Sequence, residues 1–158
     1  MTDKASIVKR KIMLKIAQDD KIRELINNND IEYPEDLIGQ NIFPYLKIDN
    51  TIQEAKICIG IAVNFPSVNR SNRLFKDTNI TILVICENGI LNMDSGYCRT
   101  DLIIERILEL INWNDWLGFD MELSYDKENP FDAKFYTREV QFTSLSHNNT
   151  VNGNRINK

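Results

Sequence analysis

Branched aliphatic residues alternate with small or polar residues in two segments near the middle of the chain. Because successive side chains of a strand point to opposite faces, this period of two predicts strands over residues 55–63 and 78–87. The second segment is apolar on both faces, which is typical of a central strand. In the first segment, one face carries large side chains, which predicts that it faces the core. The other face carries mostly small side chains, which predicts the close approach of a helix or a neighbouring subunit. The large face is Ile57, Ile59, Ile61 and Val63, and the small face is Lys56, Cys58, Gly60 and Ala62.

Apolar residues recur with helical spacing ahead of these strands. Residues 4–27 are predicted as a helix in two pieces, with Asp19 and Asp20 suiting the N-cap of the second piece. The core-facing residues are Val8, Ile12 and Ile16 in the first piece, and Ile22, Leu25 and Ile26 in the second.

A further helix is predicted after the second strand, capped by Thr100 and Asp101 and ending near Asn112. Its apolar face would be Ile103, Ile107, Leu110 and Ile111, with Glu105, Arg106 and Glu109 facing water. The large side chains that follow are expected to close one end of the core: Trp113, Trp116 and Phe119.

The last part of the chain alternates again. Met121, Leu123 and Tyr125 predict a third strand, residues 126–130 a turn or loop, and residues 135–145 a fourth strand. The order α-β-β-α-β-β predicts an α+β fold, with a mixed or antiparallel sheet of about four strands and helices on one face. We therefore expect a single domain over residues 1–145. Residues 146–158 would be a polar tail, mobile unless a neighbouring subunit orders it.

The connections between these elements differ in character. Residues 28–54 are expected to be irregular, because Pro34 and Pro44 limit regular structure, but apolar enough to lie against the core. Asn88 and Gly89 predict a turn.

The connection between the first two strands, residues 64–76, is too long for a tight hairpin and carries three cations. Ordered loops of this length are often functional. Its cations could touch phosphates or an acidic surface, and its apolar residues could anchor in a partner's pocket. The alternative is a solvated loop whose apolar residues fold back on the domain. The interface candidates are Phe65, Arg70, Arg73, Leu74, Phe75 and Lys76.

Composition and charge narrow the class of protein. The chain has 158 residues, which fits one domain, and a net charge of -4, which disfavours general nucleic-acid binding. The first 23 residues are nevertheless basic. Because no aromatic residues are interleaved, this points to a solvated or interface face of a helix rather than a nucleic-acid patch.

Candidate chemistry is sparse. The one histidine, His147, lies in the expected tail. The cysteines Cys58, Cys86 and Cys98 are odd in number and have no CxxC spacing, so we expect reduced, mostly buried thiols without a catalytic base.

Carboxylates offer one alternative, an Mg²⁺ site of a metal-dependent nuclease. Helix capping and a solvent-facing helix side explain Asp101 and Glu105. The common nuclease pattern requires a lysine two places after Glu122, and the sequence has none there. We therefore expect no enzyme, with no catalytic, cofactor-binding or metal residue. The carboxylates concerned are Asp94, Asp101, Glu105, Asp120 and Glu122.

Targeting signals are not evident in the sequence. The charged start is not followed by the apolar region of a signal peptide, and no apolar run has the roughly 18 residues needed to span a bilayer. We expect no membrane association and synthesis in a reducing cytoplasm.

Four segments in a fixed order resemble a known class of phage proteins. They are the Ile-Phe-Pro-Tyr at 42–45, the strand from Ile57, the strand from Ile80, and the Tyr-Cys-Arg-Thr-Asp at 97–101 that opens a helix. The order is similar to that of small neck proteins of tailed phages and prophages of low-GC Gram-positive bacteria. The predicted α-β-β-α-β-β order is also similar to that of tail terminators. The resemblance covers roughly residues 5–145 and leaves tail terminator, head–tail adaptor and stopper open.

The resemblance implies a structural virion protein at the phage neck, made in the host cytoplasm. It would be a homo-oligomer, a hexameric ring that ends the tail tube and joins it to the head. Its partners would be the tail tube protein and head–tail connector proteins. DNA would pass through the lumen without sequence-specific binding.

Overall fold

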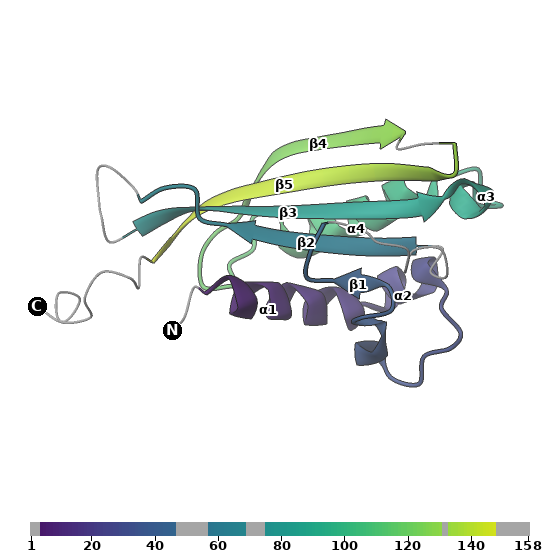
Figure 1. Cartoon of the computed structure of the whole chain (residues 1–158), viewed down its shortest axis with the longest axis horizontal. Coiled ribbons are helices and arrows are strands. Elements are labelled where there is room, and N and C mark those ends of the chain that lie inside the picture. Colours follow the sequence, from purple (N-terminus) through teal and green to yellow (C-terminus); the bar gives the residue numbers. More distant parts are fainter. Residues whose placement is uncertain (1–3, 47–56, 69–74, 131–132, 148–158) are drawn as a thin grey trace, which may run out of the picture.

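A computed structural model describes residues 4–46, 57–68, 75–130 and 133–147 of the chain (Figure 1). Its helices are α1 (Ala5–Ala17), α2 (Asp20–Ile26), η1 (Pro34–Leu37, a 3-10 turn), α3 (Asn88–Leu91) and α4 (Arg99–Ile111). Its strands are β1 (Ile42–Phe43), β2 (Ile57–Asn64), β3 (Phe75–Glu87), β4 (Glu122–Pro130) and β5 (Phe135–His147).

The strands form one mixed sheet in the order β1-β2-β3-β5-β4. Only the short β1 runs parallel to its neighbour, and the other described pairs are antiparallel. β3 is central, as its two apolar faces predict. The α+β class is confirmed, with β1 as a fifth strand that the sequence did not predict.

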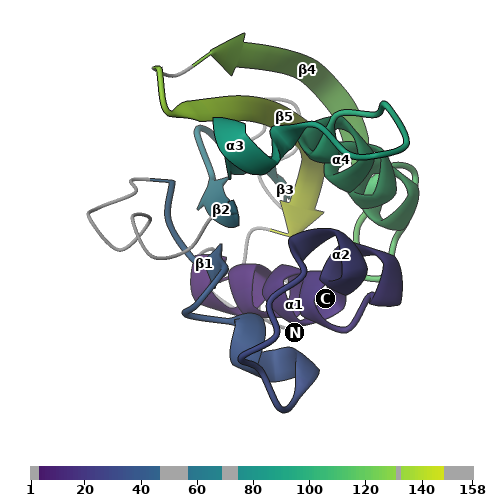
Figure 2. The ribbon, with the colours of Figure 1, turned by 90° about the vertical axis from the view of Figure 1, so that its right-hand side faces the viewer.

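The helices α1, α2 and α4 cover one face of the sheet (Figures 1 and 2). α1 contacts β2, and α4 contacts β3 and β5. The core lies between these layers and includes the predicted large face of β2 and the facing residues of β3, β5 and the helices. Representative fully buried members are Ile12, Ile59, Ile82, Ile107 and Phe142.

The opposite face of the sheet carries a smaller apolar cluster of Phe43, Cys58 and Ile85. Gly60 lies on this face. A Cβ atom added to it would come within 2.6 Å of the Tyr45 carbonyl oxygen. The close approach predicted at the small face of β2 therefore exists, but the backbone of residues 45–46 makes it instead of a helix or a neighbouring subunit.

Several predicted boundaries were wrong for identifiable reasons. Residues 126–130 are strand, because their backbone pairs with β5 while the other edge of β4 faces away from the sheet and tolerates polar residues. Asn88 and Gly89 open α3 instead of a simple turn. The irregular 28–54 connection contains η1 and β1, and Ser146 and His147 extend β5. The remaining tail residues, 148–158, lie outside the described residues.

Two side-chain predictions around α4 also fail. The N-cap of α4 is Cys98 without a side-chain cap, and Thr100 is fully buried. Phe119 is buried and Trp116 packs against the core, as expected, whereas Trp113 is 69% exposed. The main chain of Trp113 is left-handed, with φ 60°, so the chain leaves the helical conformation at this residue.

Candidate functional site

The described ends of the 64–76 connection continue the β2–β3 pairing beyond Asn64. Val68 and Lys76 form an antiparallel bridge. The Asp77 amide donates to the Ser67 carbonyl oxygen at 2.8 Å, and the Ser67 hydroxyl donates to the Asp77 carboxylate. The connection therefore begins and ends as a two-stranded ribbon at one end of the sheet.

Two of the interface candidates contact each other at this base. Phe65 is half-buried and packs against the main core, and the Lys76 Nζ lies 3.8 Å from the centroid of its ring. Phe75 begins β3 opposite His147. The other three candidates, Arg70, Arg73 and Leu74, lie outside the described residues.

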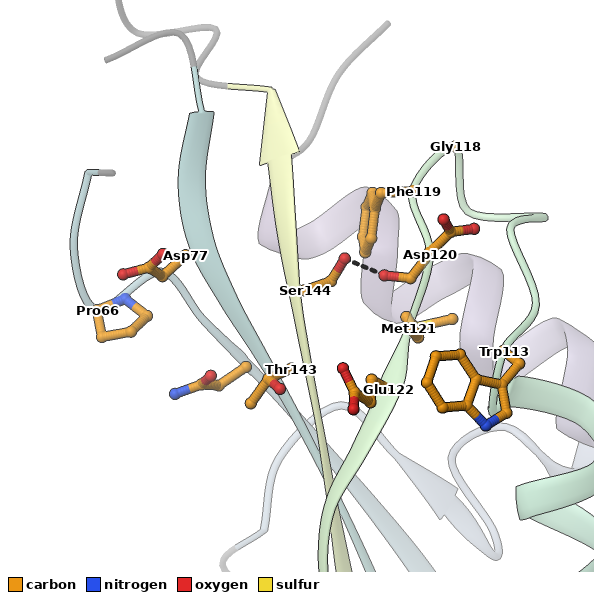
Figure 3. A pocket seen from close by; sticks show the side chains of 11 residues that line it. Pro66, Asp77, Trp113, Gly118, Phe119, Asp120, Met121, Glu122, Thr143 and Ser144 are labelled. Carbon is orange, nitrogen blue, oxygen red and sulfur yellow. Dashed lines mark hydrogen bonds between the residues drawn. The ribbon is translucent and has the colours of Figure 1, made fainter. Parts of the chain in front are cut away.

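A hollow of about 900 Å³ opens beside the loop base (Figure 3). The loop base contributes Pro66 and Asp77 to its lining. The sheet contributes Asn79, Thr143 and Ser144, and the remaining lining residues come from the segment 113–122, which runs from the end of α4 to the first residue of β4. Three parts of the sequence that are far apart thus form one concave surface.

Trp113 presents its indole at this hollow. Its amide donates to the Met121 carbonyl oxygen at 2.7 Å, which fixes the left-handed turn after α4. Figure 3 shows the indole on the same side of the hollow as Met121 and Glu122. Glycine usually occupies such a left-handed position at the end of a helix, so the sequence gives no signal for this exposed tryptophan.

The charged residues that line the hollow are all acidic. Among the described residues these are Asp77, Asp120 and Glu122, and no described lysine or arginine lines the hollow. The Asp120 carbonyl oxygen accepts a hydrogen bond from the Ser144 hydroxyl, which ties the 113–122 segment to β5 (Figure 3). The hollow therefore combines an exposed aromatic ring with negative charge, a combination suited to a basic partner surface.

The five carboxylates weighed for a metal site do not come together. Asp101 pairs with Arg138, with 2.5 Å between Oδ1 and Nη1, and Arg138 also binds Asp126 at 2.8 Å. Glu105 is exposed on α4, and Asp120 and Glu122 line the hollow. Among the described residues, no group of three His, Cys, Asp or Glu side chains is placed to hold a metal ion.

None of the three cysteines forms a disulfide. Burial raises the pKa of the Cys58 thiol to about 12 and, as the largest effect, that of Cys86 to about 11. Both thiols are therefore neutral near pH 7, and a neutral thiol is a poor nucleophile and metal ligand. This agrees with their predicted role as small buried residues.

α1 carries a stripe of exposed cations. Lys4 is the N-cap residue just before α1, and Lys11 and Lys15 lie four residues apart on one side of the helix. We call these three residues the basic stripe. The helix itself, Ala5–Ala17, contains no acidic residue. Lys15 Nζ lies 5.6 Å from the centroid of the Trp116 ring, so one end of the stripe borders the segment after α4.

Within the part of the chain that the structure describes, no helix has the length and apolar character required to cross a bilayer.

Sequence comparison places the chain in a family. The YomW family matches residues 13–144, which include every strand and helix of the fold except the first part of α1 and the end of β5. No curated protein matches the chain. The chain belongs to the YomW family, a family derived from Bacillus phages, and is thus a phage or prophage protein.

Proposed function

We propose that this protein is a structural virion protein, a subunit of a ring at the phage neck that ends the tail tube and joins it to the head. The proposal assigns it no reaction and no cofactor. It builds on the phage family and on one structural observation, the long β3–β5 ribbon at the end of the sheet.

This ribbon extends further at one end than the rest of the sheet. β3 and β5 each have 13 residues and pair from Glu87 with Phe135 to Phe75 with His147. β2 has only 8 residues and ends at Asn64, opposite Asn79. The ribbon thus presents the 64–76 connection beyond β2 on a paired, rigid base, which suits an element that contacts an adjacent subunit or ring.

The free edge of β4 is unsuited to uncontrolled strand addition. It ends in Pro130, carries Lys127 and Glu128, and has a shift in pairing register between Leu123 and Tyr125, as at a β-bulge. Charges, proline and bulges are the usual means by which proteins protect an edge strand. A subunit that stops the growth of a tube needs such a protected edge, because an open one would pair with further subunits.

The charge of the chain is compatible with DNA passage. A strongly basic lumen would hold DNA through its phosphates, whereas a neutral or acidic one would let it slide. The net charge of -4 fits the second case. In this proposal, DNA passes through the ring without sequence-specific binding.

Imaging and mass measurement test the assembly. We expect the purified protein, at high concentration or with tail tube protein, to form rings seen by negative-stain electron microscopy. Light scattering after size exclusion should give a mass that is a multiple of the 18.4 kDa chain. A strict monomer that also forms no ring with tail tube protein would contradict the proposal.

Deletion of the gene from an inducible prophage separates a terminator from an adaptor or stopper. Loss of a terminator leaves the growing tube end uncovered, so we expect tails of irregular, excessive length. Loss of an adaptor or stopper would instead give tails of normal length that fail to join heads.

A further inference from the structure

Among the described residues of the same chain, no basic side chain lines the acidic hollow. Its charged lining is Asp77, Asp120 and Glu122, and the indole of Trp113 stands at the same surface, 69% exposed. Exposed aromatic rings beside a concave surface are typical anchors of protein interfaces. A partner for this surface should therefore offer positive charge on a convex element.

The basic stripe of α1 has these properties. Its three lysines are exposed, Lys4 at the N-cap of α1 and the other two on one side of the helix, whose 13 residues include no acidic residue. None of the three lines the hollow of its own chain. Within the chain, the stripe reaches the 113–122 segment through Trp116, which is not a lining residue.

We propose that the basic stripe of one copy docks in the acidic hollow of a second copy. This inference rests on the proposed function, because it names the surfaces through which copies associate. Lysines of the stripe pair with Asp120 and Glu122, and the indole of Trp113 receives a lysine ammonium on its face. Because the two surfaces belong to different parts of the chain, repeated contacts of this kind can close into a ring.

Charge reversal on each surface tests the contact. The hollow variant is Asp120→Lys with Glu122→Lys, and the stripe variant is Lys11→Glu with Lys15→Glu. Each variant alone brings like charges together, so we expect each to lose the assembled species in light scattering. An equal mixture of the two restores opposite charges at every contact of an alternating assembly. We therefore expect the mixture to regain assembly with equal amounts of both variants by native mass spectrometry.

Matched controls keep the result interpretable. Glu32→Lys with Asp94→Lys makes the same charge change at exposed positions away from the hollow, and Lys21→Glu reverses a cation on α2. Both should assemble as the unaltered protein does. Recovery in the mixture also shows that both reversal variants are folded.

The outcomes separate this inference from the proposed function. If the unaltered protein forms rings that neither reversal weakens, the ring stands and this contact is wrong. If each reversal abolishes assembly and the mixture does not restore it, the pairing of the two surfaces is also wrong. If the unaltered protein stays a single chain, alone and with tail tube protein, the ring itself fails.

Discussion

At the scale of residues, the lack of a Cβ atom at Gly60 allows a close main-chain contact on the face of the sheet opposite the helices. It pairs with Leu83 in β3 and with Phe43 in β1, and its face lies against the main chain of Tyr45 and Leu46. The nearest atom to an added Cβ would be a backbone oxygen, which cannot rotate away. Any side chain at this position must therefore displace the segment that follows β1.

We predict that Gly60→Ala destabilises the protein by about 1–3 kcal/mol, the usual cost of overpacking. Urea unfolding followed by circular dichroism would measure it. Gly89→Ala is the matched control, because the nearest atom to its added Cβ is a side-chain oxygen at 3.9 Å. Alanine favours the helix there, so the control should be neutral or slightly stabilising. Equal stability of both variants would contradict the contact with Tyr45.

At the scale of elements, one carboxylate joins α2 to α4. Asp19 caps α2 by accepting the Ile22 amide at 3.0 Å, and it also accepts Arg106 of α4, with 2.8 Å between Oδ2 and Nη2. The sequence predicted the cap from Asp19 itself. It could not predict Arg106, which was expected to face water, because the pairing depends on how the helices pack.

The pKa of Asp19 reports on this junction. Burial by itself raises it, but hydrogen bonds from Arg106 and Ile22, with the charge of Arg106, outweigh that effect, so the pKa lies below the ordinary value of 3.8. The stabilisation is therefore present above the unfolded pKa of 3.8 and is lost as the pH falls through the lower pKa of the folded state.

We predict that Asp19→Asn reduces the loss of stability on acidification, because asparagine keeps an N-cap but does not titrate. The free energy of unfolding, measured by urea between about pH 7 and about pH 3, should fall less steeply in the variant than in the unaltered protein. Asp20→Asn, at an exposed neighbour, is the control. An unchanged slope in the Asp19 variant would show that the pair with Arg106 is not formed in solution.

At the scale of the whole molecule, the paired strands β3 and β5 extend beyond the end of β2 at one end of the sheet (Figure 1). Arg70 and Arg73 lie in the 64–76 connection, outside the described residues. The proposed function gives them a role in contact with a neighbour, because the connection is long and its described ends are held by paired strands.

We predict that Arg70→Ala with Arg73→Ala leaves the melting temperature unchanged but lowers the yield of complete particles from an induced prophage. Arg10→Ala with Lys21→Ala removes the same charge from exposed helix positions and should leave both unchanged. A normal particle yield from the Arg70 and Arg73 variant would contradict a role of the loop in assembly.

Local patterns were sufficient for much of the architecture. The alternation in β2 and β3 and the spacing in α1 and α4 identified the elements and their buried faces, because burial of an apolar face imposes its period on the sequence. They also identified the 64–76 connection, since two well-marked strands flank it. The predicted strand at β4 was too short. An edge strand pairs with a neighbour on one side only, so it tolerates polar residues that do not look like a strand in the sequence.

By itself, the sequence determined the α+β class, the central position of β3 and the helix faces. Only the tertiary structure decided the acidic hollow, since Asp77, the segment 113–122 and Ser144 come from parts of the chain that are far apart and share no local pattern. It likewise decided the pairs of Asp19 with Arg106 and of Asp101 with Arg138. The physical reason is the range of the interaction. Periodicity records which side of an element is buried, whereas a surface depends on which elements meet and on main-chain turns such as the one at Trp113.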